Sequence, residues 1–145
     1  RRVSKDRGDI ELEAGKLPDS LSDGYILKDY FAASQVGSVF AKADFVLSRS
    51  GANIVSELAA LGKPAVLIPI PWSSGNEQEN NAKVLVKAGL AVILPQTELS
   101  GERLLKTCLE FSGRLKEFIP ERATRAPVEL SAAEIIATEL FMAIR

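Results

Sequence analysis

Three short runs of continuously apolar residues, each followed by a polar turn and a helical pattern, set the strongest limit on how this chain folds. The runs are DFVLS at 44–48, PAVLIPI at 64–70 and LAVIL at 90–94. Strands that are apolar on both faces are typical of a parallel sheet with helices on each side, since a half-exposed strand would alternate apolar and polar residues. The sequence therefore predicts the α/β class, with a Rossmann-like parallel sheet flanked by helices.

The segments around these runs carry helical spacing and helix stops. Ile54, Leu58 and Leu61 lie at i, i+4 and i+7, which predicts a helical face that ends near residue 61. Gly62 and Gly89 each follow such a segment, where a glycine commonly ends a helix. By the same reasoning we expect a further strand over 25–31 and further helices over 34–43, 77–88, 100–111 and 131–145.

A length of 145 residues predicts one domain with a substantial core. Residues 1–23 are charged and contain several turn formers, which indicates a polar loop or a truncated edge. We expect residues 24–145 to form the domain and to be incomplete on its N-terminal side. A chain that begins without methionine fits such a fragment.

Composition excludes several classes of function. Lys plus Arg total 18 and Asp plus Glu total 19, so there is no strong positive field for nucleic acid. The chain has no histidine, which excludes Ser-His-Asp and Cys-His catalysis and removes the commonest metal ligand. Its single cysteine, Cys108, excludes an internal disulfide and fits a reducing compartment. We expect no metal and no cofactor. We also expect no membrane-spanning segment, because no run approaches about 20 apolar residues.

The first polar junction is the sequence SRSGAN at 48–53, with Glu57 one turn further on. In open α/β sheets ligands bind beyond the carboxyl ends of the strands. A helix that begins here would point free N–H groups at an anion, and Asn53 and Glu57 would lie on one helix face. Phosphate followed by ribose fits that layout. The alternative is that Ser50 or Asn53 only caps the helix, Arg49 forms a surface ion pair and Glu57 is solvated.

The second polar junction is the loop PWSSGN, which runs into EQENN and ends at Asn81. Glu77, Gln78 and Asn81 converge near the start of a helix because they are three and four residues apart. Amides and a carboxylate together supply donors and acceptors for several hydroxyls, as a sugar requires. The alternative is that Asn76 caps a solvated first turn. Trp72 either stacks on a ligand or covers the sheet edge, and we favour the sheet edge.

The two junctions together form a specific combination: RSGAN-x3-E, then GKP, then EQ-x2-NA. This combination resembles the C-terminal domain of MurG-type UDP-N-acetylglucosamine transferases, which have the GT-B fold and belong to glycosyltransferase family 28. The resemblance is dense over residues 43–94 and looser from residue 25 onward. It implies that the fold is the C-terminal half of a GT-B glycosyltransferase.

The resemblance also implies a role for each matching residue. Glu57 would bind the ribose hydroxyls of UDP, and Phe31 would meet uracil through its backbone. The diphosphate would lie at the helix N-terminus formed by Ser50, Gly51, Ala52 and Asn53. Hydroxyls of the sugar ring would be held by Gln78, Asn81 and Glu77. Many members of the family have His-Gln where this chain has Glu77-Gln78, so the sugar contacts can differ. The resemblance implies no catalytic residue and no metal ligand in this chain.

The activity that the resemblance implies is a hexosyltransferase. The family moves N-acetylglucosamine from UDP-N-acetylglucosamine to lipid I, forming lipid II for peptidoglycan on the cytoplasmic face of the cell membrane. The family's N-terminal domain holds the lipid-linked acceptor and makes the peripheral membrane contact, and we find no counterpart of it here. We therefore expect a donor-binding part that is inactive alone. Two alternatives are a donor-binding subunit of a two-chain transferase and a non-catalytic UDP-sugar binding module.

Overall fold

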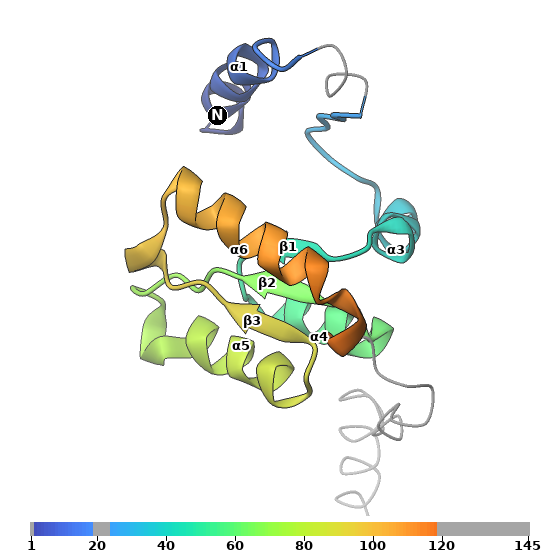
Figure 1. Ribbon diagram of the computed structural model, residues 1–145, viewed down its shortest axis with the longest axis vertical. Coiled ribbons are helices and arrows are strands. Elements are labelled where there is room, and N and C mark those ends of the chain that lie inside the picture. Colours follow the sequence, from blue (N-terminus) through green and yellow to red (C-terminus); the bar gives the residue numbers. More distant parts are fainter. Residues whose placement is uncertain (1, 19–23, 119–145) are drawn as a thin grey trace, which may run out of the picture. The chain divides into compact units, whose positions relative to one another are not determined.

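A computed structural model describes residues 2–18 and 24–118 (Figure 1). The chain divides into two compact units after Lys42. The first unit contains helices α1 (Arg2–Ala14) and α3 (Ala33–Lys42), and the second contains the sheet and its covering helices. The predicted domain extent, residues 24–145, stays a prediction, and the predicted helix at 131–145 lies outside the described residues.

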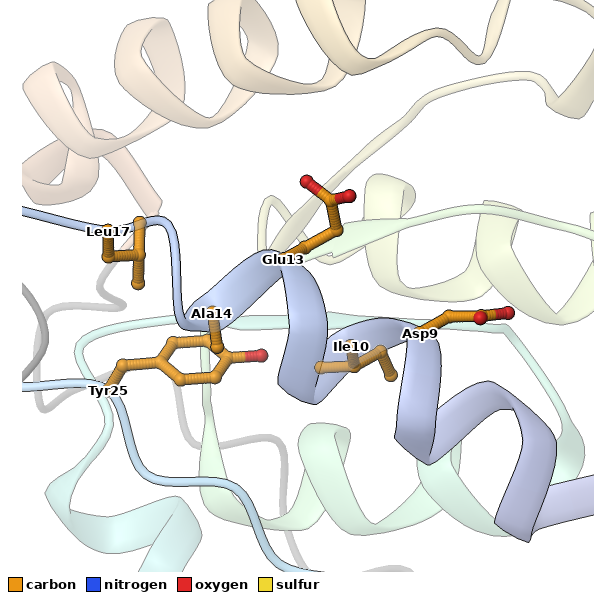
Figure 2. A pocket seen from close by; sticks show the side chains of 6 residues that line it. All are labelled: Asp9, Ile10, Glu13, Ala14, Leu17 and Tyr25. Carbon is orange, nitrogen blue, oxygen red and sulfur yellow. The ribbon is translucent and has the colours of Figure 1, made fainter.

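In the first unit, the expected loop over 1–23 is wrong for residues 2–14, which form α1. Local ion pairs support this largely polar helix: Arg7 Nε lies 2.6 Å from Glu11 Oε1, one turn away. Arg7 also pairs with Asp29. An open hollow of about 360 Å³ lies beside α1, with the Tyr25 ring next to Ala14 (Figure 2). Its lining residues are Asp9, Ile10, Glu13, Ala14, Leu17 and Tyr25.

The strand expected over 25–31 is also wrong, because this segment belongs to no helix or strand. A strand needs a neighbour for its backbone hydrogen bonds, and the strands that the structure describes pair only with one another. Tyr25, Ile26 and Tyr30 are exposed. The helix expected over 34–43 is confirmed as α3.

In the second unit, three strands form a parallel sheet in the order β1-β2-β3. They are β1 (Val46–Ser48), β2 (Ala65–Leu67) and β3 (Ala91–Ile93). Val46 pairs with Ala65, and Ala65 pairs with Ala91. The predicted parallel sheet is confirmed, and the loops after all three strands meet at its carboxyl edge.

Helices cover both faces of the sheet, as predicted (Figure 1). Helices α4 (Ala52–Leu61) and α5 (Glu77–Lys87) pack on one face, and α6 (Gly101–Gly113) packs on the other. The central strand β2 is buried on both sides, because Leu67 belongs to the cluster under α4 and α5 while Val66 belongs to the cluster under α6. This is why its sequence is continuously apolar.

The remaining elements are short 3-10 turns and the cap of α6. The turns are η1 (Ser74–Asn76), η2 (Gln96–Glu98) and η3 (Leu115–Phe118). Ser100 begins α6, where its Oγ accepts a hydrogen bond of 3.1 Å from the Arg103 N–H. Cys108 lies partly buried on α6, and burial raises the pKa of its thiol. No helix in the described ranges is long and apolar enough to cross a membrane.

Gly89 follows α5, and replacing it tests whether the chain needs a positive φ at this position. Gly89 has φ +69°, and a Cβ at this position would meet nothing within 4 Å. Alanine at residue 89 is therefore expected to lower the free energy of unfolding by about 1–2 kcal/mol through backbone strain alone. Urea denaturation measures this change. Gly101→Ala is the control, because Gly101 also has open space but no positive φ. Equal losses from both substitutions would contradict the prediction.

Candidate functional site

The carboxyl edge of the sheet brings the two predicted polar junctions together. The segment after β1 runs from Arg49 to Gly51 and leads into α4. The loop after β2 leads through η1 into α5, and the loop after β3 leads through η2 toward α6. Side chains from these loops bond to one another across the edge. The edge is therefore one connected site.

The N-terminus of α4 has no side-chain cap. Gly51 is the N-cap residue, with an extended backbone (φ −64°, ψ 156°) and no side-chain hydrogen bond to the first turn. The alternative in which Ser50 or Asn53 caps this helix is therefore wrong. Because the first N–H groups of a helix have no partner within it, those of α4 can bind an anion. Gly51, Ala52 and Asn53 lie at this N-terminus, and their contact with a diphosphate stays a prediction.

Ser50 faces α5 rather than solvent. Ser50 is fully buried, and its Oγ–H donates to the Gln78 carbonyl oxygen at 2.8 Å. The Ser50 carbonyl oxygen accepts a hydrogen bond of 3.3 Å from Asn81 Nδ2. The Ser50 side chain is thus hydrogen-bonded to α5, and because the residue is 0% exposed its predicted contact with a diphosphate could only be indirect.

The first turn of α5 brings two of the predicted sugar residues to the segment after β1. Gln78 Oε1 accepts a hydrogen bond of 3.1 Å from the Ile70 N–H, and Asn81 reaches Ser50. Gln78 Nε2 and Asn81 Oδ1 have no bond within the described part of the chain, so these atoms can meet ligand hydroxyls. Glu77 is exposed at the start of the helix.

Asn76 does not cap α5 with its side chain, so that alternative is wrong. Asn76 is the N-cap residue, but it has a left-handed backbone (φ 56°) and makes no side-chain hydrogen bond. Trp72 is 75% exposed, so the expectation that it covers the sheet edge is also wrong. Its ring is available to a ligand.

Glu57 lies on α4, one turn after Asn53. Both residues are exposed, and the spacing of four places them on one face of the helix. Among the residues that the structure describes, the Glu57 carboxylate forms neither an ion pair nor a side-chain hydrogen bond. It is therefore open to a ligand that extends from the helix N-terminus along α4.

Sequence reasoning missed the third loop of the site. Arg49 donates to the Ile68 carbonyl oxygen at 3.1 Å and to Gln96 Oε1, which ties the segment after β1 to the loop after β3. The surface ion pair considered for Arg49 is absent within residues 2–18 and 24–118. The position of Gln96, two residues after the third apolar run, was the available signal. A groove of about 310 Å³ lies beside it, lined in part by Pro69, Pro71, Asn76, Glu79, Pro95 and Gln96.

Phe31 belongs to the first unit, where Lys28 Nζ lies 5.4 Å from the centre of its ring. Its predicted contact with uracil stays a prediction. In the described ranges, no group of three or more Cys, Asp and Glu side chains is placed to hold a metal ion.

Comparison with known proteins found one family model. Residues 13–138 match the Glycosyltransferase family 28 C-terminal domain. The crystal structure of Acinetobacter baumannii MurG is similar to this chain with a TM-score of 0.62 and 26% sequence identity. That similarity covers 81% of this chain and 34% of the solved one.

Curated relatives carry the name UDP-N-acetylglucosamine--N-acetylmuramyl-(pentapeptide) pyrophosphoryl-undecaprenol N-acetylglucosamine transferase. The relative from Syntrophus aciditrophicus is 44% identical over 69 residues, which cover 48% of this chain and 19% of the relative. The relative from Exiguobacterium sibiricum is 36% identical over 100 residues, which cover 69% of this chain and 26% of the relative. The chain therefore spans about a fifth to a quarter of the length of these relatives.

Proposed function

The chain belongs to the glycosyltransferase family 28 C-terminal domain family, and from this we propose that it is the donor-binding part of a hexosyltransferase. The proposed reaction moves N-acetylglucosamine from UDP-N-acetylglucosamine to lipid I, forming lipid II in peptidoglycan synthesis. One observation carries the proposal: the segment that leads into the uncapped N-terminus of α4 is hydrogen-bonded to the start of α5, through the Gln78 backbone carbonyl and the Asn81 side-chain amide. A diphosphate and the sugar attached to it need such an arrangement.

The family resemblance assigns each part of the donor to residues of this chain. The N–H groups at Gly51, Ala52 and Asn53 would hold the diphosphate, and Ser50, which is buried, directly precedes them. Glu57 would accept hydrogen bonds from the ribose hydroxyls. The sugar hydroxyls would meet the remaining polar atoms of Gln78, Asn81 and Glu77. Uracil would meet the backbone of Phe31.

The proposed step is a displacement at the anomeric carbon. The acceptor hydroxyl forms the new bond to that carbon while the bond to the diphosphate oxygen breaks, and UDP leaves with the bonding electrons. The N-terminus of α4 stabilises the negative charge that develops on the leaving diphosphate, because its N–H groups and helix dipole point toward it. Glu57 contributes binding and takes no proton.

Other parts of the intact enzyme would supply what this chain does not offer. We propose that the lipid-linked acceptor, the base that takes its proton and the peripheral contact with the cytoplasmic face of the membrane lie there. The donor-binding chain would then be inactive without them.

A titration of the chain with UDP-N-acetylglucosamine, followed by backbone amide NMR shifts, tests the proposal. We expect the shifts to cluster at residues 50–57 and 77–81, because both segments contact the donor. ADP-glucose is the control, since it has the same diphosphate charge but a different base and sugar. Equal shifts with both ligands would indicate general anion binding. Absence of shifts with the UDP-sugar would overturn the assignment of a donor site to this chain.

A further inference from the structure

Ser50 is the one polar residue that is buried among those the structure describes, and it is 0% exposed. A buried hydroxyl usually has a partner, because an unpaired one costs free energy. The partner here is the carbonyl oxygen of Gln78, which lies 28 residues further along the chain. The bond therefore joins the segment after β1 to the start of α5, which lie far apart in the sequence.

The same residue is bonded to α5 a second time. Its carbonyl oxygen accepts the Asn81 Nδ2–H, so the first turn of α5 holds Ser50 by one donor and one acceptor. A third bond, from the Ile70 N–H to Gln78 Oε1, continues the connection into the loop after β2. We call these three bonds the Ser50 staple.

The Ser50 staple joins two segments with different proposed tasks. Ser50 directly precedes the N-terminus of α4, where the diphosphate would lie. Gln78 and Asn81 begin α5, where the sugar would lie. The Arg49 to Gln96 bond also leaves the segment after β1, but it is exposed and runs to the loop after β3.

We propose that Ser50 is a positioning residue that sets the distance between the diphosphate segment and the sugar segment of the donor site. Recognition of the sugar then depends on these bonds, because a shift of α5 relative to the N-terminus of α4 would displace Gln78 and Asn81 from a sugar attached to the bound diphosphate. This inference rests on the proposed function. It adds a residue that acts through Gln78 and Asn81 without touching the donor with its side chain.

Calorimetric titration of the chain with UDP and with UDP-N-acetylglucosamine tests the inference. The measured quantity is the sugar increment, the factor by which the attached sugar tightens UDP binding. Ser50→Ala is expected to lower this increment about tenfold, the worth of one hydrogen bond, with a smaller change for UDP alone. Ser50→Cys retains a weak donor of nearly the same size and is expected to keep part of the increment.

Ser100→Ala is the matched control. It also removes a serine hydroxyl with a hydrogen bond of 3.1 Å, but that hydroxyl caps α6 and contacts neither segment. Its sugar increment is expected to equal that of the wild type. An unchanged increment in Ser50→Ala would overturn the inference, as would equal weakening of UDP and UDP-N-acetylglucosamine. If Ser50→Ala does not fold, Ser50→Cys is measured in its place. A sugar increment in Ser50→Cys equal to that of the wild type would then overturn the inference.

Hydrogen exchange separates this inference from the proposed function. The Ile70 N–H donates to Gln78, so Ser50→Ala is expected to speed its exchange in the absence of any ligand, whereas Ser100→Ala is not. Wild-type chain that does not bind UDP-N-acetylglucosamine would overturn the proposed function and this inference together. Faster exchange with an unchanged sugar increment would overturn the inference alone.

Discussion

Alanine in place of Glu57 is expected to weaken binding of UDP-N-acetylglucosamine by about 10- to 150-fold. The exposed carboxylate has no partner in the described part of the chain. No contact within the protein therefore has to break when it binds ribose hydroxyls. A hydrogen bond to a charged group contributes about 1.5–3 kcal/mol, which gives this range of affinity. Titration calorimetry with the wild-type and Glu57→Ala chains measures the change.

A change of nucleotide shows whether Glu57 acts on the ribose. The wild-type chain is expected to prefer UDP to 2′-deoxy-UDP, and Glu57→Ala is expected to lose most of that preference. Glu110→Ala is the control, because Glu110 is also an exposed helical carboxylate but lies on α6. An unchanged dissociation constant in Glu57→Ala, or a preference for UDP that survives it, would contradict the ribose assignment.

Alanine in place of Leu58 is expected to lower the free energy of unfolding by about 2–5 kcal/mol. Leu58 is 0% exposed and lies in the cluster between α4, α5 and the sheet. The substitution removes buried methyl groups and leaves a cavity that the surrounding side chains fill only in part. Urea denaturation followed by circular dichroism measures the loss.

Leu61→Ala is the matched control for Leu58. Leu61 lies on the same helix with its side chain 47% exposed, so its replacement is expected to cost about 0.5 kcal/mol. Similar losses from both substitutions would show that α4 does not pack on the sheet through Leu58. Because Leu58 faces the core and Glu57 faces solvent, the two alanine variants are expected to affect stability and binding separately.

The three apolar runs predicted the sheet of the second unit because burial on both faces is visible in the composition of a strand. The helices followed from the spacing of Ile54, Leu58 and Leu61 and from the glycines that end α4 and α5. Convergence of the two polar junctions also followed, since parallel strands bring their carboxyl ends to one edge. The helix spacing and the parallel topology were therefore enough to place the candidate site.

Other features depend on contacts that the sequence pattern does not contain. The segment 25–31 has the composition of a strand, but composition does not show whether a neighbouring strand pairs with it. Helix α1 is polar, so it has no apolar face that would predict a helix. The pattern that indicates it is the spacing of oppositely charged residues such as Arg7 and Glu11. Ser50 was considered as a cap because caps are local, whereas its actual partner is 28 residues away.

The bonds of the Ser50 staple have a consequence for how this site can evolve. Each bond joins a side chain to a backbone atom: Ser50 Oγ to a carbonyl, Asn81 Nδ2 to a carbonyl, and Gln78 Oε1 to an N–H. The carbonyl oxygens are present whatever residue carries them, and the N–H is present in every residue except proline. The residues that carry these backbone atoms can therefore change one at a time without a matching change at Ser50, Gln78 or Asn81.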